Sequence, residues 1–480
     1  MNRPVSIRKN YLYNSAYQIL LIIAPLITTP YVSRVLGGDG IGIYSYVNSV
    51  VTYFVLFGNM GMATYGEIEI SRVRDNAETV SKLFTELILT RGLTLGISLF
   101  LYTGVIFFHR GDSGIYAIFV LNLIAAILDI TWFYQGMEDF RRIVKRNFCI
   151  KLASIVLIFC CVKTKDDLYK YALILQGAMV LGNMSLWIYL KQYSIRFNLK
   201  SFSIKRHLKE SIIYFIPTIA ISIYTVLDKT MIGIITKSPF ENGYYEQAYK
   251  IQTISITIIT AMNTVMQPRM AFLFAKQQVD EIKERLNQSV KFTLFLAIPM
   301  TFGLYGISEN LVPWFFGAGF EKVTVLLKIF SLLIIIIGIS NLIGFQYLVP
   351  GGLRSKNNKA LCLGAGVNFV LNLFLIPKFS AVGAAVASVF AELVITCFFL
   401  YYGRKFVRVI DLALYGWKYL LAASIMLVVV VNIGAFLGPT IFCTFVQIAV
   451  GSMVYIIILL ILRDSFVTAS MDRIWENIRR

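Results

Sequence analysis

About fourteen apolar windows of membrane-spanning length recur along the 480-residue chain, and they restrict its fold more than any other feature. A helix rises about 1.5 Å per residue, so about 20 apolar residues cross a hydrocarbon core of about 30 Å. Backbone polar groups inside that core must pair within the segment, which a helix achieves. The windows lie near residues 11–35, 41–65, 83–108, 114–135, 146–163, 168–190, 211–235, 244–268, 289–313, 323–348, 359–377, 380–402, 413–437 and 440–462. The sequence therefore predicts an all-α polytopic membrane protein with about 14 transmembrane helices.

The basic residues are distributed so that they orient the chain. Only 15% of the residues are charged, against about 25% in soluble domains, yet the net charge is +19. Loops on one side of the predicted helices hold clusters such as Arg141, Arg142, Lys145 and Arg146, while the opposite loops hold one or two basic residues each. Because cytoplasmic loops carry the excess of Lys and Arg, we expect both termini in the cytoplasm. Basic residues dispersed in this way do not indicate a nucleic-acid partner.

An internal repeat divides the predicted helices into two lobes. Pro25 lies in the first window and Pro217 in the seventh, while Gly42 and Gly243 open the second and the eighth. Each pair is about 200 residues apart, which fits a lobe of six helices, and paired lobes are typical of rocking transporters. The expected organisation is an N-terminal six-helix lobe at 1–190, a cytoplasmic linker at 191–210, a C-terminal six-helix lobe at 211–402, and a terminal helix pair with a cytoplasmic tail at 403–480.

Two adjacent charges lie deep in the seventh window. Asp228 and Lys229 would each cost about 2.5–3.5 kcal/mol if they faced lipid at the bilayer centre. Sequence neighbours point about 100° apart on a helix, so these two cannot neutralise each other along one face. Each must face water or another helix. The pair therefore indicates either a water-filled pathway through a helical bundle or an interhelical salt bridge that only fixes packing.

The residues that usually build metal and catalytic sites are scarce. The six cysteines lie in or beside apolar windows without a Cys-x-x-Cys motif, and the two histidines, His109 and His207, lie in short polar connections. We therefore expect no metal, no cofactor and no histidine-based catalytic centre. The external loops are too short to build an exposed reaction site, so the chain is not expected to be an enzyme.

Five segments together resemble the bacterial polysaccharide repeat-unit flippases of the Wzx type, members of the multidrug, oligosaccharidyl-lipid and polysaccharide exporter superfamily. The segments are TTPYVSRVLGGDGIGIYSY (28–46), DITWFYQGMEDFRRI (129–143), VLDKTMIG (226–233), GYYEQAYKI (243–251) and NFVLNLFLIPKFSAVGAAVASVFAE (368–392). The resemblance spans the whole chain. It implies a fourteen-helix, two-lobed transporter of a bacterial cytoplasmic membrane that moves undecaprenyl-diphosphate-linked oligosaccharides from the inner to the outer leaflet by alternating access. Such proteins serve O-antigen, capsule or exopolysaccharide synthesis, so the implied partners are the lipid-linked oligosaccharide, membrane lipids and other polysaccharide assembly proteins.

Three other functions compete with this one. A multidrug or cation antiporter of the same superfamily would place carboxylates in the N-terminal lobe, where Arg91 is the deeper charge. A peptidoglycan-precursor flippase shares the lipid diphosphate anchor and stays open as an alternative. A membrane polysaccharide polymerase would need an exposed reaction site, which the short external loops do not favour.

Four basic residues are candidates to hold the diphosphate. Arg suits an anionic diphosphate best because it donates two parallel hydrogen bonds. Arg91 lies about 12 Å from the cytoplasmic end of its predicted helix, too deep for easy snorkelling. Lys229, Arg34 and Arg269 are the further candidates. Arg34 and Arg269 lie near helix ends, where snorkelling to the interface is the simpler interpretation.

Carboxylates and amides supply the remaining candidate residues. Desolvation raises the pKa of a carboxylate, so a buried one could couple flipping to protons or sodium, or only balance the arginines. The carboxylates are Asp228, Glu392 and Asp129, the last one turn from Trp132, Phe133 and Tyr134, an aromatic group typical of interfacial anchors. Two amide stripes, Asn368 with Asn372 and Asn263 with Gln267, would contact sugar hydroxyls or join helices by hydrogen bonds.

Overall fold

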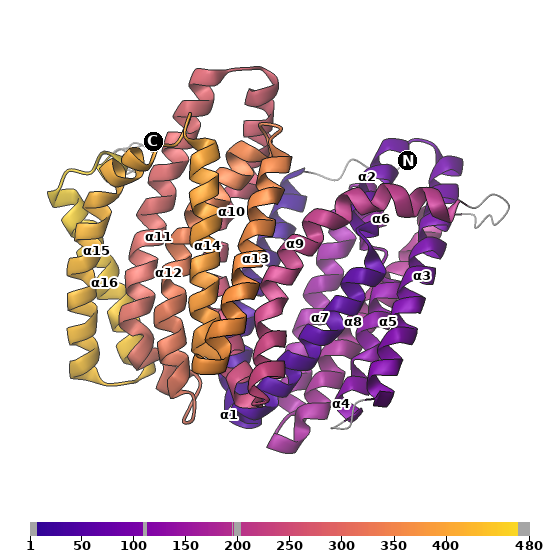
Figure 1. Ribbon diagram of the computed structural model, residues 1–480, viewed down its shortest axis with the longest axis horizontal. Coiled ribbons are helices and arrows are strands. Elements are labelled where there is room, and N and C mark those ends of the chain that lie inside the picture. The colour runs from indigo at the N-terminus through magenta and orange to yellow at the C-terminus, as the bar shows by residue number, and fades with distance from the viewer. Residues whose placement is uncertain (1–6, 109–112, 194, 196–202, 469–480) are drawn as a thin grey trace. The chain divides into compact units, whose positions relative to one another are not determined.

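The computed structural model describes residues 7–108, 113–193, 195 and 203–468, and the regular elements in these ranges are helices with no strand (Figure 1). The helices are α1 (Ile7–Asn59), α2 (Met62–Val73), α3 (Ala77–Phe108), α4 (Ser113–Ile118), α5 (Val120–Leu128), α6 (Thr131–Gly136), α7 (Phe140–Cys161), α8 (Leu168–Leu190), α9 (Ile204–Thr236), α10 (Pro239–Ala275), α11 (Val279–Phe315), α12 (Glu321–Ile343), α13 (Arg354–Phe379), α14 (Ala381–Gly403), α15 (Val409–Leu437) and α16 (Ile441–Ile461). Short turns η1 (Lys165–Asp167) and η2 (Lys191–Tyr193) flank α8, and a π-helix, η3 (Gly344–Leu348), follows α12.

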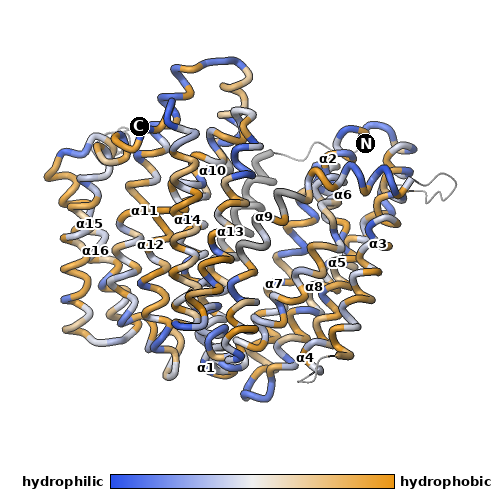
Figure 2. The backbone as a smooth tube through the Cα atoms, viewed as in Figure 1, coloured by the Kyte–Doolittle hydropathy of each residue, from blue (hydrophilic) through white to orange (hydrophobic). Residues whose placement is uncertain are grey.

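The predicted fold class is confirmed. Ten segments of the described chain are long and apolar enough to cross a membrane. Figure 2 shows hydrophobic residues along the long helices and hydrophilic ones gathered near their ends. Each predicted window overlaps a helix, and the window at 168–190 coincides with α8 (Leu168–Leu190). The number of fourteen spanning helices stays a prediction.

The chain forms two compact units, Met1–Gly233 and Ile234–Arg480, called here the first and the second unit. The boundary falls inside α9, so most of this helix is grouped with the first unit. Part of the predicted linker, from Ile204 onward, is already helical, while residues 196–202 lie outside the described part of the chain. The four-part division at 190, 210 and 402 stays a proposal.

In the first unit, α1 bends sharply at one glycine. Gly37 has φ 68° and ψ 177°, and it interrupts the helix between the first two predicted windows. A residue with a Cβ would be strained at this positive φ, and the added atom would lie 2.8 Å from the Asp39 carboxylate. Figure 1 shows α3, α5, α7 and α8 running side by side, with α2 and α6 near one end of the unit and α4 near the other.

The fourth predicted window, 114–135, is not one helix but three, α4, α5 and α6. The break between α5 and α6 lies at Asp129, whose backbone is extended with φ −72° and ψ 112°. Its carboxylate accepts a 2.9 Å hydrogen bond from the Thr131 backbone N–H. Short polar side chains compete in this way with helical hydrogen bonding, which explains why an apolar window stops being helical here.

An aromatic cluster fills the end of the first unit next to this break. Trp132, Phe133 and Tyr134 are buried, and the Phe84 ring stacks on Trp132 at 5.6 Å between ring centroids. The expectation that these three residues form an interfacial anchor is wrong, because their side chains pack inside the unit instead of facing lipid headgroups. Gly66 of α2 permits this packing, since a Cβ there would lie 2.7 Å from the Trp132 ring.

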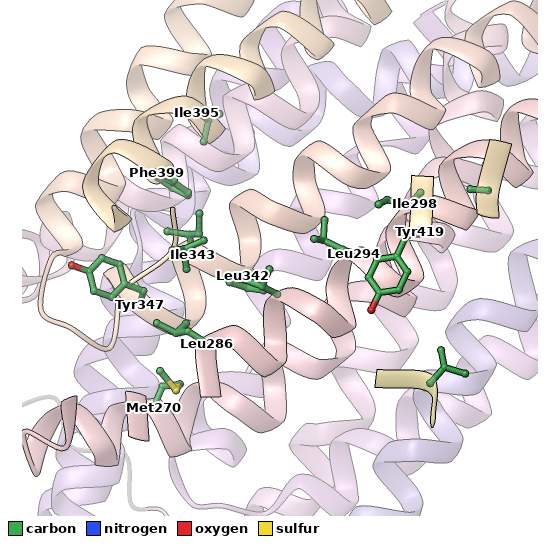
Figure 3. Close-up of a cluster of buried hydrophobic side chains, with 14 of the residues drawn as sticks. Met270, Leu286, Leu294, Ile298, Leu342, Ile343, Tyr347, Ile395, Phe399 and Tyr419 are labelled. Atoms are coloured by element: carbon green, nitrogen blue, oxygen red, sulfur yellow. The ribbon is translucent and has the colours of Figure 1, made fainter. Parts of the chain in front are cut away.

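The second unit is built from α10 to α16. Figure 3 shows its main apolar core, where Leu294 and Ile298 of α11 lie close to Tyr419 of α15, and Leu342 of α12 lies beside Ile343. Lipid is as apolar as these side chains, so helices in membranes associate through close packing of small residues. Small residues accordingly line the contact between α13 and α14, where Gly364 packs against Ile395. Figure 1 shows α10 and α11 projecting past their neighbours at the turn that joins them.

Candidate functional site

The deepest predicted cation, Arg91, is paired with a predicted carboxylate. Arg91 lies on α3 with 3% of its side chain exposed. Its guanidinium donates one hydrogen bond to the Asp129 backbone carbonyl and another, at 3.3 Å, to the Asp129 carboxylate. Its Nε, which is buried, makes no hydrogen bond. The structure thus pairs Arg91 with Asp129 at the break between α5 and α6, an arrangement that corresponds to the charge-balance alternative for Asp129.

A chain of amides crosses the interior of the first unit. The buried Gln176 of α8 accepts a 3.0 Å hydrogen bond from Asn122 of α5 and donates one of 3.2 Å to the Tyr44 hydroxyl of α1. Sequence reasoning missed Asn122 and Gln176, although an isolated amide inside an apolar window is itself a signal. These bonds connect three helices and leave each amide committed to a neighbour.

Asp228 and Lys229 lie on α9, a different helix from the ones that carry Arg91 and Asp129. Asp228 is buried, whereas Lys229 is partly exposed, and both take part in further interactions. The next residue, Thr230, donates a 2.9 Å hydrogen bond to Ser49 of α1. Pro217 lies within the helical backbone of α9, but its side chain is outside the described part of the structure. Lys229 is therefore more accessible than Arg91, whose side chain is buried.

The two cations expected near helix ends lie at the surface of their units. Arg34 on α1 is exposed. Arg269 near the end of α10 is 47% exposed, forms a 2.6 Å ion pair with Glu281 of α11, and lies 5.5 Å over the Phe272 ring. Exposed ion pairs contribute about 0–1 kcal/mol, so this pair is a minor contribution to stability. This geometry agrees with the snorkelling interpretation of Arg269.

One member of the predicted amide stripe on α10 joins that helix to another helical segment. Asn263 accepts a 2.7 Å hydrogen bond from Gln346 of the π-helix η3, and both side chains are buried. Gln267, the expected second member, is partly exposed. Sequence reasoning missed Gln346, since the spacing of residues along one helix does not reveal a partner on another. π-helical turns are frequent at functional sites, which makes this pair a candidate for substrate contact or for helix adjustment.

The second amide stripe is buried inside the second unit. Asn372 donates a 3.1 Å hydrogen bond to Asn368 on α13, and both side chains are fully buried. Glu392 and Ser388 of α14 are buried as well, and Ser388 lies 3.4 Å from the Tyr245 hydroxyl of α10. Because these groups lie inside the second unit, this arrangement favours hydrogen bonding between helices over direct contact with sugars.

A partly exposed polar stripe on α10 was missed. Glu246 and Lys250 lie 3.7 Å apart, and Thr253, Thr257 and Thr260 follow at intervals of three or four residues. Such spacing places the five side chains on one face of the helix. Two charges inside the predicted window 244–268 were the available signal. A face that combines hydroxyls with both signs of charge can bind a polar, hydroxyl-rich molecule.

The described residues hold no group of three or more His, Cys, Asp or Glu side chains placed to bind a metal ion. The candidate residues are cations, carboxylates, amides and hydroxyls held on helices.

Two family models match the chain, each over more than half of its length. The model described as polysaccharide biosynthesis protein matches residues 7–274. The model described as lipid II flippase MurJ matches residues 147–459.

Curated relatives cover the chain to different extents. A protein of Escherichia coli (strain K12) named "Putative O-antigen transporter" is 25% identical over 409 residues, which are 84% of this chain and 97% of that protein. A protein of Haloferax volcanii named "Probable low-salt glycan biosynthesis flippase Agl15" is 28% identical over 192 residues, which are 39% of each chain.

Solved structures share the fold. A structure of the lipid II flippase MurJ in an inward closed conformation superposes with a TM-score of 0.75 at 18% identity, covering 95% of this chain and 99% of that one. An inward-facing multidrug transporter of the MATE family gives 0.61 at 12% identity, covering 82% of this chain and 98% of that one.

Proposed function

The chain belongs to the polysaccharide biosynthesis protein family of the multidrug, oligosaccharidyl-lipid and polysaccharide exporter superfamily, and on that premise we propose that it is a flippase for lipid-linked oligosaccharides. This membership confirms the resemblance read from the sequence. The proposed substrate is an undecaprenyl-diphosphate-linked repeat unit, moved from the inner to the outer leaflet of a bacterial cytoplasmic membrane by alternating access. The transported unit would enter a surface polysaccharide such as an O-antigen, and both termini would lie in the cytoplasm.

The observation that carries the proposal is the match of the polysaccharide family model across residues 7–274 of a polytopic helical protein. The curated relative that covers most of the chain has a name that refers to O-antigen transport. Transport of a polar, charged headgroup through a membrane also requires charged and amide side chains within helices, and α9 and α10 carry them.

We propose Lys229 as the first contact of the diphosphate, because it is the partly exposed member of the deep cations. Arg34 is proposed as a second contact. In this structure the guanidinium of Arg91 donates hydrogen bonds to Asp129. A direct contact between Arg91 and a diphosphate would therefore require that pair to separate. We therefore assign Arg91 and Asp129 to charge balance and to positioning of α6. Arg269 is proposed to contact lipid headgroups at the interface.

The sugars are proposed to contact the polar stripe of α10. Thr253, Thr257 and Thr260 offer hydroxyls, and Gln267 continues the polar residues toward the end of the helix. Asn263, Asn368 and Asn372 are buried, so their proposed role is to hold helices in place during transport. Asp228 and Glu392 stay candidates for ion coupling.

A lipid II flippase is the second candidate, favoured by the MurJ family match over residues 147–459 and by the fold. Both candidates share a lipid diphosphate anchor and differ in the sugars. One experiment separates them: the gene is deleted in its own organism, the undecaprenyl-linked sugars are extracted, and mass spectrometry identifies what accumulates while an impermeant reagent reports its leaflet.

Accumulation of a completed polysaccharide repeat unit in the cytoplasmic leaflet, reversed by the intact gene, supports the proposal. Accumulation of peptidoglycan precursor instead supports the second candidate. If neither a polysaccharide repeat unit nor a peptidoglycan precursor accumulates in the cytoplasmic leaflet, both candidates are contradicted.

A further inference from the structure

One buried histidine ties the start of α9 to two other helices of the first unit. His207 has 1% of its surface exposed. Its Nε2 lies 2.9 Å from Oε2 of Glu86 on α3, and its Nδ1 lies 3.1 Å from the hydroxyl of Tyr65 on α2. Both ring nitrogens are thus engaged, each by a different helix. Neither contact belongs to the residues proposed above to meet the substrate.

The hydrogen-bond geometry fixes the protons on this ring. The Tyr65 hydroxyl donates its single hydrogen to Glu210, at 2.5 Å. Toward His207 the same oxygen can therefore only accept, so Nδ1 must carry a hydrogen. Nε2 faces a carboxylate, which as an ion also only accepts, so Nε2 must carry a hydrogen too. The arrangement is satisfied by an imidazolium ring that donates to both neighbours.

The charged groups around the ring favour this state. Glu86 approaches from α3, Glu210 and Arg206 from α9 itself, and Glu69 lies near Tyr65 on α2. Glu69 forms an ion pair with Arg72 and Glu210 with Arg206, so the negative charge that faces the ring is mainly that of Glu86, and it stabilises a cation. The hydrogen bond from Tyr65 keeps the pKa of Glu210 below its usual range, so Glu210 stays ionised and keeps the Tyr65 hydrogen committed.

We propose that the His207–Glu86 pair binds one exchangeable proton, and that this proton holds the start of α9 against α2 and α3. The role in transport rests on the proposed function. Without the proton, the neutral ring keeps a single hydrogen, so it can donate to Glu86 or to Tyr65 but not to both, and the link from α9 to one of these two helices would open. Asp228 and Lys229 lie on the same helix, about 30 Å further along. His207 is accordingly a positioning residue for them.

Hydrogen exchange of the purified full-length protein tests the link. The protection of residues 203–215 is measured by mass spectrometry from about pH 5.5 to pH 8.5, the range in which histidine charge normally changes. If the link depends on a single proton, the equilibrium constant for its opening should increase about tenfold per pH unit above the transition. His207→Gln should abolish this pH dependence. Protection that does not vary with pH, or a transition that persists in His207→Gln, would overturn the proposal.

Nuclear magnetic resonance reads the ring directly and does not depend on transport. The sequence has two histidines, so His109→Gln leaves His207 as the single source of ¹⁵N-histidine signals and also serves as the control in the exchange experiment. Two protonated ring nitrogens at about pH 6 are expected. A neutral ring at that pH would contradict the assignment. Because neither measurement needs a substrate, failure of the deletion experiment would remove the flippase proposal and leave this one standing.

Discussion

Arg91 donates hydrogen bonds to both the backbone carbonyl and the carboxylate of Asp129, which lies 38 residues further along the chain. The backbone carbonyl is available because α5 has just ended, and the carboxylate also holds the first turn of α6 through Thr131. A buried cation, a helix break and the next helix start therefore depend on one aspartate. Arg91, a candidate to bind the substrate, therefore helps to hold Asp129 and the start of α6 in place.

Replacing the two members of this pair should have unequal effects. Asp129→Asn leaves a buried cation without its counter-charge, which costs about 3–5 kcal/mol. Arg91→Gln leaves a carboxylate that is 27% exposed, and about 1–3 kcal/mol is expected from the lost hydrogen bonds. Thermal unfolding of the purified protein measures both. The double variant should be more stable than Asp129→Asn alone.

The control is Arg269→Gln, which removes an exposed ion pair with Glu281 and should change stability by no more than about 1 kcal/mol. If Arg91→Gln is as harmless as this control, the pair does not support the fold.

Gly66→Ala should destabilise the first unit although alanine favours helices. The new Cβ would lie 2.7 Å from the buried Trp132 ring, and overpacking costs about 1–3 kcal/mol. Gly92→Ala is the matched control, since a Cβ there meets no atom within 4 Å and the helix gains up to about 1 kcal/mol. Unfolding midpoints that move in opposite directions confirm the contact, and equal shifts would argue against it.

Lys229→Gln should impair flipping while the protein still folds. A hydrogen bond to a charged group contributes about 1.5–3 kcal/mol, so substrate binding should weaken about tenfold or more. Lys229→Arg should retain most activity, because the cation remains. The measurement is the amount of lipid-linked repeat unit in the cytoplasmic leaflet at matched protein levels. Lys378→Gln, near the end of α13, is the control for removal of a positive charge, and normal flipping by Lys229→Gln would refute the assignment.

The start of α9 should lose protection at low pH as well as at high pH. The pKa of Glu210 is lowered by the Tyr65 hydrogen bond, from an ordinary value of 4.5. A carboxyl with a depressed folded pKa stabilises the structure above its unfolded pKa, and this contribution is lost as pH falls through the folded value. Hydrogen-exchange protection of residues 203–215 should therefore be highest at an intermediate pH, above the transition caused by Glu210 and below the transition caused by His207.

Tyr65→Phe removes the hydrogen bond to Glu210, so the loss of protection at acidic pH should occur at a higher pH. If the pH of this acidic transition is unchanged in the variant, Glu210 is not its origin.

The sequence by itself determined the membrane-spanning helical class and most helix positions. Whether a segment such as 168–190 must be helical in lipid depends on its own hydrophobicity and length, and these are properties of consecutive residues. The five family segments were also readable without coordinates. Arg91, Asp228 and Lys229 were found because a charge in an apolar window is conspicuous, although Glu246 and Lys250 in the window 244–268 were missed.

Only the tertiary structure decided the partners of those residues. The Asn263–Gln346 bond joins residues 83 positions apart, and Tyr65 and His207 are separated by 142. Periodicity shows which residues share a face of one helix, but the neighbour of that face depends on how all the helices pack. For the same reason the break at Asp129 was not foreseen, since the cation that binds its free carbonyl comes from another helix.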